Sequence, residues 1–360
     1  MLFWKNKKVL ITGHTGFKGS WLSLWLQKWG AEVIGFSLNP PTRPSLFELA
    51  NVAGGMHSYN GDVRNYDLLK SVVEKHRPEI LIHMAAQPLV RHSYRNPIET
   101  FEINVMGTVN VLEVVRNTDS VQVIINVTSD KCYENKEWVW GYRETDPMGG
   151  YDPYSASKGC AELITSSFRN SFFNASASGD RPRMLASVRA GNVIGGGDWA
   201  EDRLVPDMIR AILQREPVLV RNPQAIRPWQ HVLDPLYGYL LLAENLWISG
   251  IEFGEGWNFG PSEQDAAPVS KLVEKVCALW GGDAKWTLDE KNHPHEANYL
   301  KLDCSKARMK LDWKPKLQFD DTIEWVVDWY KSYVAQADMQ QVTLDQMNKY
   351  EQLLRGAGND

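Results

Sequence analysis

Short apolar runs alternate with helix-like segments through the first half of the chain, and this alternation restricts the fold more than any other feature. Helices are expected at residues 20–29, at residues 98–117 and from Pro153 onward. A strand–helix alternation of this kind builds right-handed βαβ units, so we predict an α/β fold with a parallel, doubly wound sheet. The runs that read as strands are "KKVLIT", "AEVIGF", "EILIHMAA", "VQVIINVTS" and "RMLASVRA".

The regular alternation ends near Asn192, after which loop-like segments become frequent. We therefore expect residues 1–191 to form a Rossmann-like domain and residues 192–360 to form a smaller C-terminal lobe that binds the substrate. About residues 230–260 should return to the first domain, because "GWNFG" has the pattern of a strand. Ligands of doubly wound sheets bind beyond the carboxyl ends of the strands, so residues that follow strands are the candidates for function.

Charge and cysteine content argue against several classes of function. The formal net charge of −5 disfavours a protein that binds nucleic acids or membrane surfaces by general electrostatics. No apolar run is long enough for a signal peptide or a membrane span. The 4 cysteines lack the spacing of metal ligands, and His293 and His295 flank a proline without further ligands, so no metal site is expected. Without an export signal the thiols should stay reduced, which favours a cytoplasmic location.

A glycine-rich turn follows the first predicted strand. The stretch "VLITGHTGFKGSW" places Gly13, Gly16 and Gly19 between that strand and a helix. Glycines here permit a tight turn, bring the backbone close to a pyrophosphate and let the helix pack against the strand. Loops often contain glycine, but this position between strand and helix favours a dinucleotide site and hence an NAD-binding domain.

The residues that distinguish NAD from NADP are less decisive. An acidic residue usually ends the second strand and binds the adenosine ribose. Here "GFSLNPPTRP" supplies Ser37 and Asn39 but no carboxylate, while Arg43 is close enough in sequence to meet a 2′-phosphate. Asp62, which follows the third strand, is a candidate acceptor for the adenine amino group, or else an ordinary residue of a surface turn.

Two groups of polar residues suggest acid–base chemistry. Tyr154 and Lys158 are four positions apart on a predicted helix and therefore share one face. A phenol with a pKa near ~10 is a poor base, but a nearby ammonium and a positive nicotinamide ring favour the phenolate. Directly after a strand come Ser129, Asp130 and Lys131. These residues form either an ordinary turn or a set of acid–base groups. A chance Tyr–Lys pair is common, but its coincidence with the glycine turn and Ser129 is not.

With these motifs the chain resembles the extended short-chain dehydrogenase/reductase family along nearly its whole length, through "HMAAQP", "RAGNVIGGGD", "RPWQHVLD" and "LDCSKARMKLDWKP" as well. The resemblance implies that Ser129 binds the sugar C4 hydroxyl, Tyr154 takes its proton and Lys158 holds the nicotinamide ribose. It also implies a homodimer or homotetramer formed through the helices at 98–117 and 153–170. The NAD-binding residues it implies are Gly13, Thr15, Gly16, Phe17, Lys18, Gly19, Asp62, Val63, Ala85, Ala86, Gln87, Asn104, Tyr154 and Lys158.

The resemblance also implies residues that bind a nucleotide-sugar substrate. "IRPWQHVLD" is similar to a family segment in which the arginine, here Arg227, grips the diphosphate, and Asn192 would contact the same group. Leu204 and Val205 would line the base pocket. Tyr299 matches the tyrosine of an Arg-Tyr pair in related dehydratases, although an asparagine precedes it here. For His231 and Asp234, a structural role and a functional role are equally expected.

Members of this family include epimerases, reductases and 4,6-dehydratases, and the strand-end residues favour a dehydratase. A dehydratase must remove the C5 proton and expel the C6 hydroxyl, which takes two further proton-transfer groups. Asp130, held protonated by burial, would be the acid at C6. Lys131 stands where thymidine-nucleotide relatives carry glutamate; it would act at C5 as a desolvated neutral base, or stay charged and stabilise the enolate.

Three alternatives to a dehydratase for cytidine nucleotides stay open at this stage. They are a nucleotide-sugar epimerase, a dehydratase for another base, and a non-catalytic dinucleotide-binding regulator that uses the same fold. The overall resemblance favours a cytidine nucleotide, but no single residue is identified that reads the cytosine.

Overall fold

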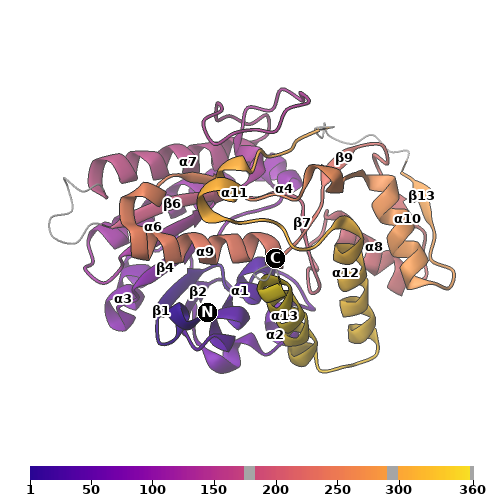
Figure 1. The fold of residues 1–360 in the computed structure, drawn as a ribbon, viewed down its shortest axis with the longest axis horizontal. Helices are drawn as coiled ribbons and strands as arrows, with labels where there is room; N and C mark the ends of the chain where they lie inside the picture. Colours follow the sequence, from indigo (N-terminus) through magenta and orange to yellow (C-terminus); the bar gives the residue numbers. More distant parts are fainter. Residues whose placement is uncertain (174–182, 290–298, 357–360) are drawn as a thin grey trace.

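A seven-stranded parallel sheet forms the centre of the molecule in the computed structural model, which describes residues 1–173, 183–289 and 299–356 (Figure 1). The strand order is β11-β6-β5-β4-β1-β2-β3, and each pair of neighbours is parallel. The order runs in opposite directions from β1 and β4, which is the reversal of a doubly wound sheet. The predicted fold class is confirmed. The strands are β1 Lys8–Thr12, β2 Glu32–Ser37, β3 His57–Asn60, β4 Ile80–His83, β5 Val123–Val127, β6 Met184–Arg189 and β11 Gly256–Asn258.

Helices cover both faces of this sheet, so the central strands are buried throughout. Side chains of α3, α6 and α7 pack on one face, where Leu10, Leu81 and Ile124 point. Side chains of α1 and α9 pack on the other face, where Val9 and Ile125 point. The helices are α1 Phe17–Lys28, α2 Leu46–Leu49, α3 Tyr66–His76, α4 Val90–Arg95, α5 Pro97–Phe101, α6 Gly107–Arg116, α7 Pro153–Phe172 and α9 Leu233–Ser249.

The second half of the chain adds helices and three short two-stranded sheets beside the α1 and α9 face (Figure 1). Its "GWNFG" segment is a strand, as expected, and joins the edge of the main sheet as β11. The apolar core continues from the sheet into the C-terminal helices, and the division at residue 191 stays a prediction. The remaining elements are α8 Leu204–Leu213, α10 Val269–Trp280, α11 Ser305–Leu311, α12 Phe319–Val334, α13 Met339–Gly356, and the strand pairs β7 Val193–Ile194 with β10 Gln230–His231, β8 Val218–Val220 with β13 Trp286–Leu288, and β9 Ile226–Pro228 with β12 Ala266–Pro268.

The tryptophans of the first helix hold the C-terminal helix in place. Trp25 is fully buried, and its Nε1 and that of Trp29 donate to Glu351 on α13 over 2.9 and 2.8 Å. Lys28 pairs with the same carboxylate at 2.6 Å. The helix predicted at residues 20–29 begins earlier, at Phe17, because it grows directly from the glycine turn. Among the described residues, no helix is both long and apolar enough to cross a membrane.

A buried carboxylate fixes the start of α9. Asp234 accepts hydrogen bonds from the Lys316 N–H at 2.7 Å and the Tyr350 hydroxyl at 2.8 Å. His231 nearby is also fully buried, packs edge-on against Trp21 and Trp325, and has a pKa lowered to about 3 by burial. These contacts support the structural interpretation of both residues.

We predict that Asp234 makes stability depend on pH. Burial raises the pKa of this carboxyl from 3.8 to about 7, so the folded protein binds one more proton than the unfolded chain between these values. The free energy of unfolding contributed by Asp234 should therefore fall as pH rises, by up to about 1.4 kcal/mol per pH unit, and level off above the folded-state pKa. The difference in urea stability between wild type and Asp234→Asn should show this slope from about pH 5 to about pH 7. Parallel stability curves would contradict the assignment.

Candidate active site

The predicted catalytic residues meet at the carboxyl edge of the sheet, where β5 ends beside the start of α7. Ser129 caps a short 3₁₀ turn, Asp130–Cys132, by accepting from the Lys131 N–H at 3.2 Å. Asp152 caps α7 by accepting from the Ser155 N–H, and Pro153 occupies the first turn. Both caps set the direction in which the following side chains leave the backbone.

Tyr154 is buried, and its hydroxyl lies within hydrogen-bonding reach of Ser129. Burial raises the pKa of Tyr154 to about 12; the Ser129 hydrogen bond acts against this and the Asp130 carboxylate adds to it. A pKa this high keeps the phenol protonated at neutral pH. It needs additional positive charge before it can serve as a base.

Lys158 lies one turn further along α7 and is also buried. Its ammonium donates to the Val127 carbonyl at 3.3 Å, at the last residue of β5. Burial lowers the pKa of Lys158 to about 8, and the Glu162 carboxylate limits this decrease. The side chain is thus held at the strand end, within the same group of residues as Ser129 and Tyr154.

Asp130 and Lys131 have contrasting environments. The Asp130 side chain lies in a residue that is 4% exposed, accepts from the Ser129 hydroxyl at 3.0 Å and packs against Gly191. A Cβ at residue 191 would lie 1.7 Å from Asp130 Oδ2, so only glycine leaves room for this carboxylate. Lys131 is exposed, so burial among the described residues does not supply the desolvation that a neutral amine would need.

Arg203 is a charged residue of this region that the sequence motifs did not identify. It pairs with Asp198 at 2.9 Å, which raises the pKa of its guanidinium. Its charge lowers the pKa of Tyr154 and that of Lys18. The second half of the chain therefore supplies a cation to the carboxyl edge of the sheet where the predicted catalytic residues meet, here called the catalytic edge. The sequence signal that could have identified Arg203 is its position directly before Leu204, which was expected to line the base pocket.

The glycine turn fits a dinucleotide pyrophosphate. Gly13 has φ +79°, and a Cβ there would lie 2.7 Å from the Ala85 N. A Cβ on Gly19 would lie 2.1 Å from the Gly13 carbonyl oxygen, so both glycines are required by packing within the protein. Gly16 has room for a Cβ and is the N-cap of α1 without a side-chain cap. Its absence of a side chain thus leaves the first N–H groups of the helix accessible to an anion.

The other residues of the turn have distinct surroundings. The Thr15 hydroxyl donates to the Leu38 carbonyl at 2.9 Å and joins the turn to the end of β2. Phe17 packs against Gly195 in the loop after β7. Burial lowers the pKa of Lys18 to about 8, Arg203 lowers it further, and Asp130 acts in the opposite direction. Lys18 therefore lies near the catalytic carboxylate as well as the turn.

Asp62 and Val63 follow β3 at the far side of the expected cofactor. Arg64 binds both carboxylate oxygens of Asp62, at 2.7 to 3.1 Å, and this pairing lowers the pKa of Asp62. Val63 is buried, and its side chain occupies the space above Gly107. The arrangement is compatible with an adenine contact or with a surface turn, and the contact stays a prediction.

The residues after β4 are tied to α7. The Gln87 N–H donates to Asn104 Oδ1 at 2.8 Å, and Asn104 Nδ2 donates to Ser157 Oγ at 2.9 Å. Asn104 lies in a π-helical segment, Glu102–Met106, that interrupts the helix predicted at 98–117. Segments of this kind are frequent at functional sites. Ala85 and Ala86 precede Gln87 in the same loop, beside Gly13.

The predicted substrate residues are distributed over the second half of the chain. Asn192 lies between β6 and β7 with φ +51°, and its carbonyl accepts from the Gln230 N–H. Leu204 and Val205 begin α8, and Val205 is buried in the core. Arg227 lies on β9, and Tyr299 accepts through its carbonyl from Asn135 Nδ2 at 3.1 Å. Asn298, the residue before Tyr299, lies outside the described residues. Contacts of these side chains with a nucleotide stay predictions.

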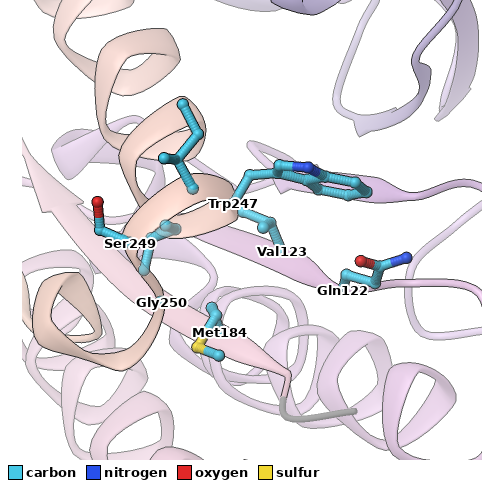
Figure 2. A pocket seen from close by; sticks show the side chains of 8 residues that line it. Gln122, Val123, Met184, Trp247, Ser249 and Gly250 are labelled. Carbon is cyan, nitrogen blue, oxygen red and sulfur yellow. The ribbon is translucent and has the colours of Figure 1, made fainter.

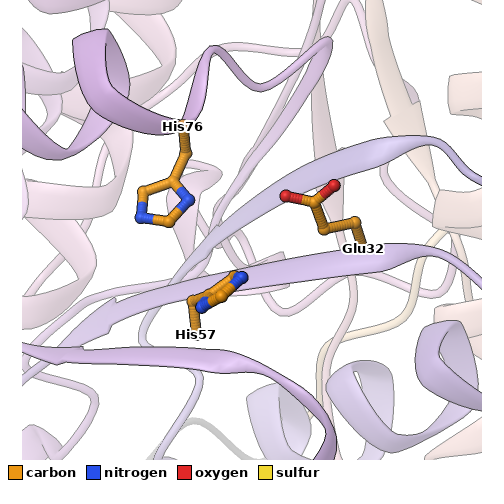
Figure 3. A group of neighbouring side chains, drawn as sticks. All are labelled: Glu32, His57 and His76. Carbon is orange, nitrogen blue, oxygen red and sulfur yellow. The ribbon is translucent and has the colours of Figure 1, made fainter.

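Two other features lie at the opposite edge of the sheet. A shallow cavity of about 220 Å³ includes Val123 and Met184, the first residues of β5 and β6 (Figure 2). Glu32, His57 and His76 form a surface group whose possible ligand atoms lie within 4.8 Å of one another (Figure 3). Because the strands are parallel, the amino ends of β2, β3, β5 and β6 lie away from Tyr154. Neither feature belongs to the catalytic edge.

Known proteins resemble this chain along nearly its whole length. A CDP-glucose 4,6-dehydratase of Salmonella typhimurium is 57% identical over 337 residues, covering 94% of this chain and 94% of that protein. A crystal structure of UDP-glucose 4-epimerase from Thermotoga maritima with UDP-glucose matches with a TM-score of 0.78 at 22% identity, covering 91% of this chain and 99% of that one. A dTDP-glucose 4,6-dehydratase from Bacillus anthracis in complex with NAD matches with a TM-score of 0.73 at 21% identity, covering 93% and 99%. The two structures support the fold.

A family model described as GDP-mannose 4,6 dehydratase matches residues 10–326. This match spans most of the 360 residues and includes the glycine turn, the strand-end residues and the tyrosine–lysine pair. The chain belongs to the GDP-mannose 4,6 dehydratase family, within the extended short-chain dehydrogenases/reductases.

Proposed function

We propose that the chain converts CDP-D-glucose to CDP-4-dehydro-6-deoxy-D-glucose with NAD as cofactor. The observation that carries this proposal is the meeting of Tyr154 and Ser129 with a buried carboxylate, Asp130, and an amine, Lys131, at one strand end. An epimerase needs only the first two of these groups. The relative with 57% identity, a CDP-glucose 4,6-dehydratase, supports both the reaction and the cytidine nucleotide.

The first half of the reaction uses the Ser129–Tyr154 pair. NAD, held at the glycine turn, would supply the hydride chemistry at C4 and C6 of the sugar. Ser129 holds the C4 hydroxyl, and Tyr154 removes its proton. Because burial raises the pKa of Tyr154 to about 12, charges that favour the phenolate are needed, and the Arg203 guanidinium acts in this direction.

The elimination uses the two residues that follow Ser129. The ketone at C4 acidifies the C5 hydrogen, so that C5 loses a proton while the C6 hydroxyl leaves as water. Asp130, which is buried beside Ser129, protonates the leaving hydroxyl. Lys131 acts at C5, either as the base once substrate covers it or as a cation that stabilises the enolate.

The assembly and the cellular context follow the same proposal. Ile98 on α5 and Leu163 on α7 are 75% and 62% exposed, and apolar side chains on these two helices suit a homodimer or homotetramer interface. The product is a precursor of 3,6-dideoxysugars in the O-antigen of bacterial lipopolysaccharide, and we place the enzyme in the cytoplasm. The substrate is a nucleotide sugar, without nucleic-acid or membrane partners.

Replacing Tyr154 with phenylalanine should abolish most activity. The variant keeps the ring in its buried position but removes the proton acceptor, and we expect kcat to fall about 10³-fold. The 4-keto product is measured by its absorbance in alkali after incubation with CDP-glucose. Tyr151→Phe is the matched control, because Tyr151 is 85% exposed and should lose less than about twofold. Equal activity of the two variants would contradict the role of Tyr154.

Substitutions of Lys131 should distinguish a base from a stabilising charge. Arginine stays protonated in proteins and cannot act as a base. If Lys131 removes the C5 proton, Lys131→Arg and Lys131→Ala should both slow solvent deuterium incorporation at C5, about 10²-fold or more. If it stabilises the enolate as a cation, Lys131→Arg should retain much of the exchange.

The control for this series is Lys136→Ala, since Lys136 is an exposed lysine of the same loop that pairs with Glu134. Normal C5 exchange in Lys131→Ala would exclude both roles. A wild-type product that retains the C6 oxygen would instead indicate an epimerase.

A further inference from the structure

A buried ion pair lies directly beneath the catalytic edge. Glu162 on α7 and Arg189 at the end of β6 have side chains only 4% and 5% exposed, and they pair in a two-pronged geometry with both N–O distances at 2.8 Å. Glu162 also accepts from the Thr128 hydroxyl at 2.5 Å and the Ser187 hydroxyl at 2.6 Å. Each carboxylate oxygen thus has two donors. Although burial alone would raise it, these donors lower the pKa of Glu162.

The ion pair forms hydrogen bonds with the residues on either side of the segment 129–132, which contains the proposed elimination residues. Thr128, bonded to Glu162, directly precedes Ser129. Tyr133, which follows the segment, accepts at its hydroxyl from Arg189 Nη1 at 2.5 Å. The residues between these two anchors include Asp130 and Lys131.

The Tyr133 anchor is itself well defined. Its hydroxyl donates to Asn258 Oδ1 on β11 at 2.8 Å, and the Arg189 guanidinium lies 5.0 Å from the centre of its ring. The ring stacks on that of Tyr142, with centroids 5.2 Å apart and planes 20° apart. Because Tyr133 is fully buried, it has little freedom to move while these contacts persist.

Glu162 also lies close to two of the residues proposed for oxidation at C4, which are Ser129 and Lys158. Glu162 is one helical turn beyond Lys158 on α7, and its charge raises the pKa of that lysine. Thr128 adjoins Ser129. Glu162 therefore lies next to the residues of the C4 chemistry, while Arg189 binds Tyr133, which follows Asp130 and Lys131 along the chain.

We propose that the Glu162–Arg189 pair positions Asp130 and Lys131 for the elimination, through Tyr133 at the far end of their segment. Neither member touches the substrate; both are positioning residues. The inference rests on the proposed function, since it separates oxidation at C4 from elimination across C5 and C6. Loosening the Tyr133 anchor should slow elimination while oxidation continues.

Tyr133→Phe tests this inference, because it removes the hydroxyl that Arg189 binds and keeps the stacked ring. Reactions with CDP-glucose are quenched with borodeuteride, which converts 4-keto-glucose and 4-keto-6-deoxyglucose into products separable by mass. We expect formation of the 6-deoxy product to fall about tenfold and the trapped 4-keto-glucose fraction to rise. Solvent deuterium incorporation at C5 should slow by the same factor.

Tyr142→Phe is the matched control. Its ring belongs to the same stack and is also buried, but its hydroxyl bonds only within the loop, to Asn135 and the Lys136 N–H, among the hydrogen bonds of the described residues. Its ratio of trapped intermediate to product should equal that of wild type. Melting temperatures of both variants exclude general unfolding as the cause.

The inference is overturned if Tyr133→Phe keeps wild-type turnover, or if its turnover falls without accumulation of 4-keto-glucose. Arg189→Lys is the second variant if Tyr133→Phe does not fold, because it keeps a positive charge beside Glu162 but its single ammonium cannot replace the guanidinium that binds both Glu162 and Tyr133. It should also raise the ratio of trapped 4-keto-glucose to 6-deoxy product, and a wild-type ratio in this variant would overturn the inference. Failure of the proposed function has a different outcome, because wild-type protein would then yield no 4-keto product at all.

Discussion

The pairing of Glu162 with Arg189 is the interaction on which the catalytic edge depends. It joins helix α7 to strand β6 across the end of β5, three elements that are separated in sequence and meet only in the folded sheet. A buried ion pair contributes little net stability, but the loss of one partner costs about 3–5 kcal/mol because a charge is left without compensation. What the pair provides is a defined geometry at the strand end that carries Ser129, Asp130 and Lys131, the residues proposed to act on the sugar.

The site is completed from both halves of the chain. The first half supplies the glycine turn and the acid–base residues, and its tight packing is visible at Gly13 and Gly19, where any side chain would collide with backbone. The second half supplies Arg203, held by Asp198, and Gly191 stands directly against Asp130 at the junction. A carboxylate thus lies buried next to a hydroxyl, while the Arg203 guanidinium acts on the tyrosine. This charge arrangement suits a reaction that first removes and later delivers protons.

Local patterns in the sequence predicted the sheet, the glycine turn and the Tyr154–Lys158 pair, because each depends on residues close together in the chain. Features that depend on tertiary contacts were missed. Arg203 lies outside the motifs of the sequence analysis, and Arg189 begins the motif "RAGNVIGGGD", but its pairing with Glu162 is recognised only when β6 and α7 are placed together. For Lys131 a desolvated base and a charged stabiliser were both open, and the 3₁₀ turn leaves its side chain exposed. The cofactor and nucleotide contacts depend on ligands and stay predictions.

The central claim is that one active site oxidises C4 and reduces C6 of the same sugar. The most direct measurement uses CDP-glucose carrying deuterium at C4, converted by the protein without added NADH, with the label located in the product by NMR. The account predicts that deuterium moves to C6 of the 4-keto-6-deoxy sugar within the same molecule. Deuterium that stays at C4, or that is lost from the sugar, would contradict it.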